Sequence, residues 1–254
     1  VQYFASDKIA LFAMKGRIVS PKDAPQLHGV VDRLCALADM QKPRVAIAQS
    51  DIPNAFATGR NQKNSVVCVT TGILRRLDEP ELEAVLSHEL SHVAHHDVAV
   101  MTIASFLGIL AGFLTRILYW SDLFGGFEGG GGGGANMAIF EIGALLFSVV
   151  VYAISFLLIR ALSRYRELAA DRSGALLIGQ PRLLANALVK VSGEIARIPT
   201  KDLRAAEHFN AFYFAPAFAK GTSLSSLFST HPPLQKRLEE LAKLEAAMGR
   251  GAAV

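Results

Sequence analysis

The 254-residue sequence predicts an α+β fold: a mainly helical domain with a small antiparallel sheet, interrupted by a two-helix hairpin. Helical apolar patterns dominate both ends of the chain, and short β-prone runs lie between residues 45 and 70. Two long apolar segments, residues 98–120 and 137–159, lie in the middle. They raise the mean hydropathy to +0.32, which is too apolar for an ordinary soluble domain.

The part of the chain before residue 78 supplies the expected sheet. Pro25 to Met40 is an amphipathic helix with apolar side chains along one stripe. Three short β-prone runs follow, separated by turn residues: Val45–Ala48, Ala55–Thr58 and Val66–Thr70. We expect them to form a small antiparallel sheet packed on the next helix, with an edge strand that can pair with an extended peptide.

The next helix carries two histidines four residues apart, in the stretch His88-Glu89-Leu90-Ser91-His92. Asp78 is its expected N-cap, followed by a proline and acidic residues in the first turn. Residues i and i+4 share one face of a helix, so His88 and His92 can bind one zinc ion, with Glu89 beside it as a candidate general base. The alternative is a solvated helix with two incidental histidines, because short motifs also arise by chance.

A second charged helix, residues 164–172, is expected to supply the third ligand. Glu167 offers a carboxylate, and two histidines with one glutamate are a known catalytic zinc ligand set. Asp171 lies one turn further along the same face, where it can orient a histidine or an arginine. Taken alone, the segment also fits a solvated helix face with Arg–Glu pairs. The histidine motif favours the metal site.

Both apolar segments are long enough to cross the ~30 Å hydrocarbon core of a bilayer as helices. The glycine-rich linker between them, Ser121–Asn136, contains no Lys or Arg, whereas three arginines follow the second segment: Arg160, Arg164 and Arg166. The positive-inside rule therefore places the metal motifs in the cytoplasm and the linker outside. The alternative is a pair of buried helices in a large soluble core.

The chain is thus expected to have three parts: residues 1–97 with the histidine helix, 98–160 as a transmembrane hairpin, and 161–254 with the third ligand. Within the last part, we expect helices from Ala175 and from Pro181, and a final amphipathic helix from Leu234. Between them lies an aromatic cluster that suits a cleft wall, a membrane-facing flap or ordinary packing: Phe209, Phe212, Tyr213, Phe214 and Phe218.

Charge and cysteine content exclude several classes of protein. The net charge of +4 is mild and suits a surface facing anionic lipid, and no aromatic-basic motif indicates nucleic-acid binding. Cys35 and Cys68 are too few and too scattered for a disulfide framework and are read as buried reduced thiols. The glycine run lacks the lysine and Ser/Thr of a phosphate-binding loop.

Five motifs, in order along the chain, resemble the HtpX family of bacterial membrane-integrated zinc metalloproteases. They are Ser6-Asp7-Lys8-Ile9-Ala10, Asn54-Ala55-Phe56-Ala57-Thr58-Gly59, His88-Glu89-Leu90-Ser91-His92, Arg166-Glu167-Leu168-Ala169-Ala170-Asp171 and His231-Pro232-Pro233-Leu234. The resemblance covers nearly the whole chain. Family members usually carry two spanning helices before the Ser-Asp-Lys segment, and this chain opens at Val1, so we expect upstream sequence.

The resemblance implies one zinc ion per chain, held by His88, His92 and Glu167, with Glu89 as general base and Asp171 behind a ligand. It also implies that Asn54 binds substrate and that His231 stabilises the tetrahedral intermediate. From the residues alone, Asn54 reads as a turn residue and His231 as a helix cap. The implied location is the bacterial inner membrane, as a multi-pass protein with a cytoplasmic site.

The expected function is that of a membrane-bound zinc endopeptidase that cleaves misfolded or membrane proteins in stress response and protein quality control. Two other classes remain open. One is a catalytically silent membrane adaptor with a zinc site, although structural zinc sites usually have four ligands rich in cysteine. The other is a zinc hydrolase of small molecules, which the expected edge strand makes less attractive.

Overall fold

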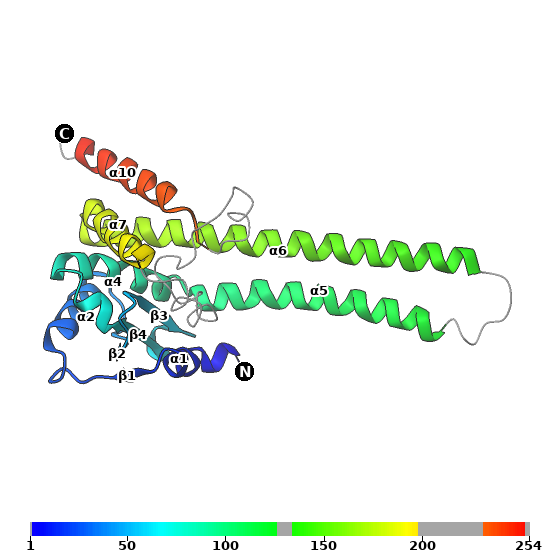
Figure 1. Ribbon diagram of the computed structural model, residues 1–254, viewed down its shortest axis with the longest axis horizontal. Helices are drawn as coiled ribbons and strands as arrows, with labels where there is room; N and C mark the ends of the chain where they lie inside the picture. Colours follow the sequence, from blue (N-terminus) through cyan, green and yellow to red (C-terminus); the bar gives the residue numbers. More distant parts are fainter. Residues whose placement is uncertain (1, 126–133, 198–230, 252–254) are drawn as a thin grey trace. The chain divides into compact units, whose positions relative to one another are not determined.

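The computed structural model describes residues 2–125, 134–197 and 231–251 (Figure 1). Helices and strands both occur, and the α+β prediction is confirmed. The helices are α1 (Gln2–Ala13), α2 (Pro25–Leu37), α3 (Thr71–Leu74), α4 (Glu79–Ala94), α5 (Asp97–Gly125), α6 (Gly134–Ile178), α7 (Pro181–Arg197) and α10 (Leu234–Gly251). The strands are β1 (Gly16–Ile18), β2 (Arg44–Ala48), β3 (Ala55–Gly59) and β4 (Ser65–Thr70), with a 3-10 turn at Gln62–Asn64.

The four strands form one mixed sheet in the order β1-β2-β4-β3. β3 pairs with β4 and β1 pairs with β2 in antiparallel fashion, but β2 and β4 are parallel. The prediction of an antiparallel sheet is therefore wrong for the central pair. After β2 the chain crosses to the far edge as β3 and returns as β4 between the two, so β4 runs in the direction of β2. Short apolar runs predict strands but do not fix their order.

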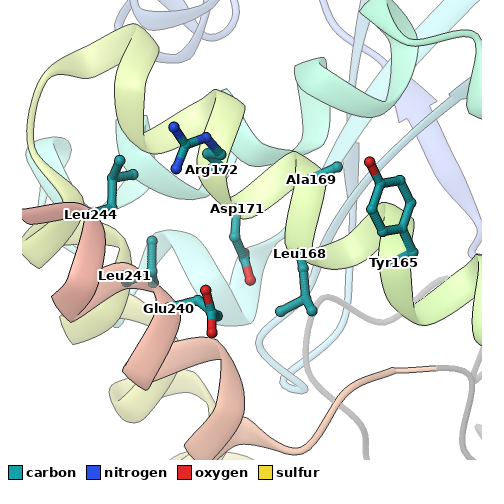
Figure 2. A pocket seen from close by; sticks show the side chains of 8 residues that line it. All are labelled: Tyr165, Leu168, Ala169, Asp171, Arg172, Glu240, Leu241 and Leu244. Carbon is teal, nitrogen blue, oxygen red and sulfur yellow. The ribbon is translucent and has the colours of Figure 1, made fainter. Parts of the chain in front are cut away.

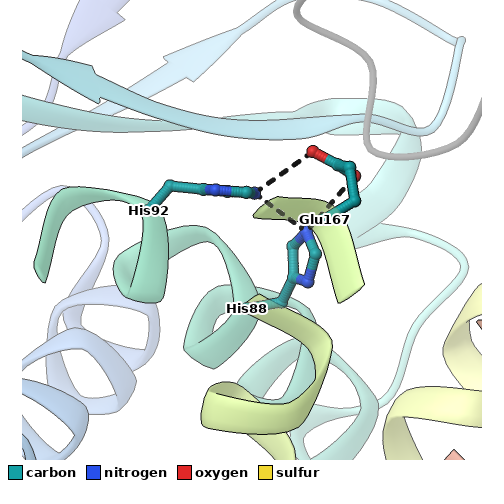
Figure 3. A group of neighbouring side chains, drawn as sticks. All are labelled: His88, His92 and Glu167. Atoms are coloured by element: carbon teal, nitrogen blue, oxygen red, sulfur yellow. Dashed lines mark hydrogen bonds and ion pairs between the residues drawn. The ribbon is translucent and has the colours of Figure 1, made fainter. Parts of the chain in front are cut away.

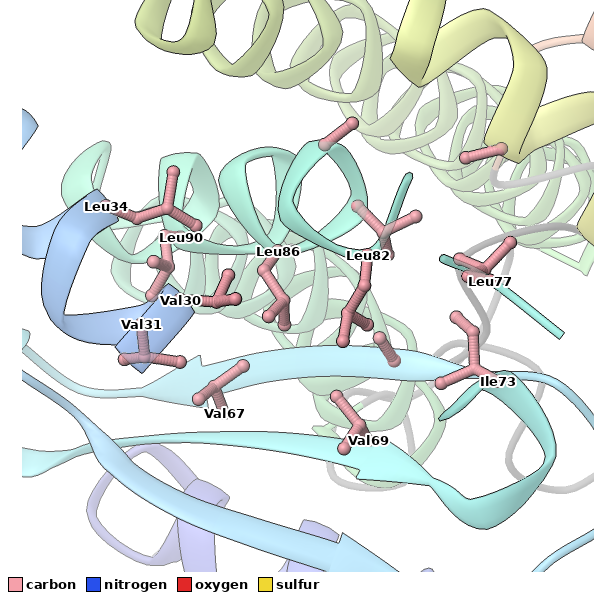
Figure 4. Packing of buried hydrophobic residues seen from close by; sticks show 14 of the residues in the cluster. Val30, Val31, Leu34, Val67, Val69, Ile73, Leu77, Leu82, Leu86 and Leu90 are labelled. Atoms are coloured by element: carbon pink, nitrogen blue, oxygen red, sulfur yellow. The ribbon is translucent and has the colours of Figure 1, made fainter. Parts of the chain in front are cut away.

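Both faces of the sheet are buried, because successive side chains point to opposite faces and every residue of β4 is buried. One face packs with α1, through Ala46, Ala48, Phe56, Val66 and Cys68. The opposite face contributes Val45, Val67 and Val69 to the main core under α2 and α4. Figure 4 shows leucines of α4 and valines of α2 lying over this face. The helix α4, which carries the two histidines, therefore packs against the sheet on one side and contacts α7 as well.

The start of α4 follows the prediction closely. Asp78 is the N-cap: its side chain accepts a hydrogen bond from the amide of Glu81 at 2.9 Å, and the Glu81 carboxylate accepts from the amide of Asp78 at 3.1 Å. This reciprocal capping box satisfies two amides that have no partner within the helix. It fixes where α4 begins, and with it the face on which the histidines lie.

Contacts along the chain divide it into two compact units, residues 1–99 with 163–254, and residues 100–162. In the second unit, Gly108 of α5 lies against α6, since a Cβ there would meet Ile159 and Ser155 at 3.6 and 3.7 Å. Gly112, about one turn further along α5, has open space around it. Among the described residues no single helix meets a test of length and apolarity for a membrane span. Residues 79–94 and 97–110 together meet it, as two helices bent by 52°.

Two expected features lie partly or wholly outside the described residues. The linker at 121–136 is helical at both its ends, within α5 and α6, while residues 126–133 are not described. The aromatic cluster at 209–218 falls in the undescribed stretch 198–230. The helices expected near Pro25, Pro181 and Leu234 are all present as α2, α7 and α10.

Candidate metal centre

Three side chains from two helices converge on one point (Figure 3). His88 and His92 project from the same face of α4, and Glu167 reaches them from α6. The ligand atoms of the three residues all lie within 4.8 Å of one another. The structure therefore brings together the three residues that the sequence predicts as metal ligands.

The spacing of these atoms fits a tetrahedral metal ion. His88 Nε2 lies 3.2 Å from His92 Nε2, His92 Nε2 lies 3.4 Å from Glu167 Oε1, and His88 Nε2 lies 3.9 Å from Glu167 Oε2. Metal–ligand distances of about 2.0–2.1 Å in a tetrahedral zinc site place neighbouring ligand atoms about 3.3 Å apart. The donor set and its geometry thus suit zinc.

The outer nitrogens of the two histidines face carboxylates. His88 Nδ1 lies 2.9 Å from Asp171 Oδ1, and His92 Nδ1 lies 2.5 Å from Asp97 Oδ2. A carboxylate only accepts hydrogen bonds, so in a neutral ring the proton sits on Nδ1 and Nε2 carries a lone pair. The two Nε2 atoms then face each other as acceptors. A metal ion bound by both nitrogens would offset the repulsion between lone pairs that lie 3.2 Å apart.

Asp171 is itself held by an arginine that the sequence reasoning missed. Arg237 of α10 is 1% exposed and donates to both carboxylate oxygens, from Nε to Oδ2 at 2.7 Å and from a terminal nitrogen to Oδ1 at 2.6 Å. Burial opposes ionisation of Asp171, but the Arg237 charge holds the pKa of Asp171 below its usual value. One signal was available, because Arg237 interrupts the leucine stripe that starts at Leu234 and continues at Leu241.

His231 contacts Glu167 through its ring. Its Nδ1 donates to Glu167 Oε2 at 3.0 Å. Burial alone would raise the pKa of Glu167, but this hydrogen bond holds it well below the usual value. Glu167 is therefore kept as a carboxylate, the form that binds a metal. The role of His231 towards a tetrahedral intermediate stays a prediction.

Glu89 lies beside the ligands but is held differently. It is 5% exposed, and its Oε2 accepts a hydrogen bond from the amide of Ala57 on the edge strand β3 at 3.0 Å. Burial raises the pKa of Glu89 to about 7. A carboxylate with a pKa near neutrality can both take and return a proton at neutral pH, as a general base requires.

Asn54, the predicted substrate-binding residue, comes directly before β3. Asn54 is fully buried. Its backbone N–H donates a hydrogen bond to the hydroxyl oxygen of Thr70 at 2.9 Å, which fixes the backbone at this point. Asn54 thus anchors the start of the edge strand that carries Ala57. Its contact with substrate stays a prediction.

A pocket of about 300 Å³ lies between α6 and α10, with Asp171 in its lining (Figure 2). Figure 2 shows leucines of both helices and the charged side chains of Arg172 and Glu240 around it. Asp171 belongs to this lining and also contacts His88, while Leu168 of the lining directly follows Glu167 in the chain. The pocket therefore lies beside residues that neighbour the proposed ligands.

Gly174 sets the distance between α4 and α6 at the site. A Cβ at this position would lie 2.7 Å from the His88 amide nitrogen and 2.9 Å from its Cα, closer than real contacts allow. Ser87 adds a hydrogen bond from its hydroxyl to the Gly174 carbonyl at 3.1 Å. The two helices meet backbone to backbone, which places Glu167 within reach of His88.

Gly174→Ala is expected to force α4 and α6 apart by several tenths of an ångström. The overpacking should lower the free energy of unfolding by about 1–3 kcal/mol and weaken metal binding. Thermal unfolding and zinc titration measure the two effects. Gly193→Ala in α7 is the matched control, since a Cβ there meets nothing within 4 Å and alanine favours helix by up to about 1 kcal/mol. Equal behaviour of the two variants would contradict the role of Gly174.

Most of the chain is similar to known proteins. Residues 21–245 match the sequence model of peptidase family M48. The chain belongs to this family. The protease HtpX homolog 1 of Streptomyces coelicolor is 59% identical over 252 residues, covering 99% of this chain and 81% of that protein. The protease HtpX homolog of Moorella thermoacetica is 53% identical over 249 residues, covering 98% and 81%.

A solved structure shares the fold. The crystal structure of S. mikatae Ste24p matches with a TM-score of 0.63 at 18% identity, over 94% of this chain and 55% of that chain, so this chain spans about half of its length. The family match and the two HtpX homologs confirm the resemblance to the HtpX family, and the chain is a metalloprotease of family M48. Membership in this family implies a metal ion, for which the His88, His92 and Glu167 group offers a fitting site.

Proposed function

We propose that this protein is a membrane-bound zinc endopeptidase that cleaves misfolded or membrane proteins at the cytoplasmic surface. The observation that carries the proposal is the convergence of His88, His92 and Glu167 next to the buried carboxylate of Glu89. Two histidines and one glutamate leave a fourth position of a tetrahedral ion open, as catalytic zinc sites do. A silent adaptor needs no such base, and no observation favours it.

The roles of the side chains follow from their positions. A bound zinc ion would supply Lewis acidity, polarising the scissile carbonyl and acidifying water. Glu89 accepts the proton of the attacking water and passes it to the leaving amine, for which its pKa of about 7 is suited. His231 donates a hydrogen bond to the carbonyl oxygen as negative charge develops on it. Asp171 orients His88.

Substrate is proposed to bind along β3 as an added strand. β3 is an edge of the sheet, and its Ala57 amide contacts Glu89. A sheet edge binds an extended peptide through main-chain hydrogen bonds, and these bonds do not depend on the side chains of the peptide. That suits the varied sequences of misfolded proteins. Asn54, fixed just before β3, supports the start of this edge.

The membrane assignment rests on composition and exposure in residues 100–162. Large apolar side chains that are exposed gather on α5 and α6: Val100, Ile103, Phe106, Ile109, Leu110, Phe113, Ile142, Leu146, Phe147, Val149, Val150, Tyr152, Ile154, Leu157 and Leu158. An apolar surface of this extent is typical of contact with lipid. The absence of Lys and Arg from residues 121–136, against Arg160, Arg164 and Arg166, favours a cytoplasmic metal site.

Casein cleavage tests the proposal. The purified chain in detergent is expected to cut casein, to lose this activity when a chelator removes the metal, and to regain it with added zinc. Metal removal should stop cleavage because no described side chain replaces the Lewis acid. Persistent cleavage at zero metal content, or a zinc-loaded protein without activity, would overturn the endopeptidase proposal.

A further inference from the structure

Each histidine of the metal centre is backed by an aspartate and an arginine. On His88, the pair is Asp171 with Arg237. On His92, the corresponding pair is Asp97, the first residue of α5, with Arg166 of α6. The second pair was not expected from the sequence.

One oxygen of Asp97 binds both partners. Asp97 Oδ2 accepts from His92 Nδ1 at 2.5 Å and from a terminal nitrogen of Arg166 at 2.6 Å. Asp97 is 5% exposed, and the side chain of Arg166 is 16% exposed, so both charges are largely shielded from water. A carboxylate held this way fixes the ring plane and the tautomer of a metal-binding histidine.

The contact depends on a break in the chain between two helices. α4 ends at Ala94, and His96 adopts a left-handed backbone with φ of 55° before α5 begins at Asp97. In an unbroken helix, a residue five positions after His92 would lie about 140° round the axis from it. The reversal at His96 turns the Asp97 carboxylate back onto His92.

The geometry points to Asp97 and Arg166 as positioning residues: Asp97 holds His92 in its metal-binding orientation, and Arg166 acts only by holding Asp97. This inference rests on the proposed zinc site. Arg166 and Glu167 are neighbours on α6. One turn of this helix therefore supplies the proposed ligand Glu167 and also the arginine that holds Asp97 against His92.

Asp97 also stands at a helix N-terminus, where an acid is favourable for helix stability alone. Asparagine has nearly the same size as aspartate but provides no carboxylate for His92 and Arg166, and it removes one negative charge from the first turn of α5. Comparing Asp97→Asn with a variant that removes a negative charge from another helix N-terminus separates the two roles. Asp78→Asn is the matched control, since Asp78 caps α4 with an exposed side chain away from both histidines.

The test is the zinc affinity of the full chain, measured by competition with a chelator. Asp97→Asn should weaken zinc binding about 10- to 100-fold while Asp78→Asn leaves it unchanged. Arg166→Gln should reduce the zinc affinity by a smaller factor than Asp97→Asn. Arg166→Lys, which keeps the positive charge, should bind zinc nearly as well as the wild type. Adding Arg166→Gln to Asp97→Asn should cost nothing further, because Arg166 then has no carboxylate to hold.

Three outcomes would overturn the inference: unchanged affinity in Asp97→Asn, an equal loss in Asp78→Asn, or additive losses in the double variant. If Asp97→Asn fails to fold, the comparison of Arg166→Gln with Arg166→Lys decides, because both variants leave Asp97 in place. A wild-type chain that binds no zinc contradicts the proposed function instead, so the two failures are distinct.

Discussion

Glu89→Gln is expected to lower casein cleavage by about 10²- to 10⁴-fold while the protein keeps its zinc. Glutamine is the same size, and its amide oxygen can still accept the hydrogen bond from Ala57 that Glu89 accepts at 3.0 Å. It cannot take a proton from water. The loss should therefore appear in the rate of the chemical step, with the fold and the metal content unchanged.

Glu167→Gln is the matched comparison, because the two glutamates lie at the same site, Glu89 buried and Glu167 with a side chain only 13% exposed, and both become neutral amides. Glu167 is a proposed ligand, so this variant should lose zinc as well as activity, as measured by metal analysis of the purified protein. Two results would contradict the assignment of roles. One is a fully active Glu89→Gln protein, and the other is an unchanged zinc content in Glu167→Gln.

Local spacing explains why the ligands could be predicted from the sequence. His88 and His92 are related by a single helical turn, and Glu167 and Asp171 by another, so each pair shares a face wherever its helix packs. The N-cap at Asp78 follows from a four-residue pattern. Such features need no knowledge of the tertiary structure.

Features that depend on the path of the chain were not predictable in this way. β1 has only three residues and no apolar run, and the parallel pairing of β2 with β4 reflects the order in which the strands enter the sheet. Asp97 reaches His92 only because the backbone reverses at His96. Gly174 looks like any helical glycine until α4 is seen packed against it.

Arg237→Met is expected to be the most destabilising of the substitutions considered. Arg237 is almost fully buried and forms a two-point contact with Asp171, at 2.7 and 2.6 Å. Methionine fills much of the same space but leaves the Asp171 carboxylate buried without its countercharge. Breaking a buried ion pair from one side typically costs about 3–5 kcal/mol of stability. Thermal unfolding with chelator present measures this cost without the contribution of metal binding.

Two further variants separate charge from packing. Arg182→Met removes another arginine that contacts α10, through an ion pair with Glu245. The side chains of Arg182 and Glu245 are 75% and 41% exposed, so the free energy of unfolding should fall by less than about 1 kcal/mol. Asp171→Asn added to Arg237→Met removes the stranded charge and should recover part of the stability, although not the zinc affinity, because His88 keeps only a neutral partner. If Arg237→Met instead melts like Arg182→Met, then burial of the pair contributes nothing, and His88 must be oriented by Asp171 without help from α10.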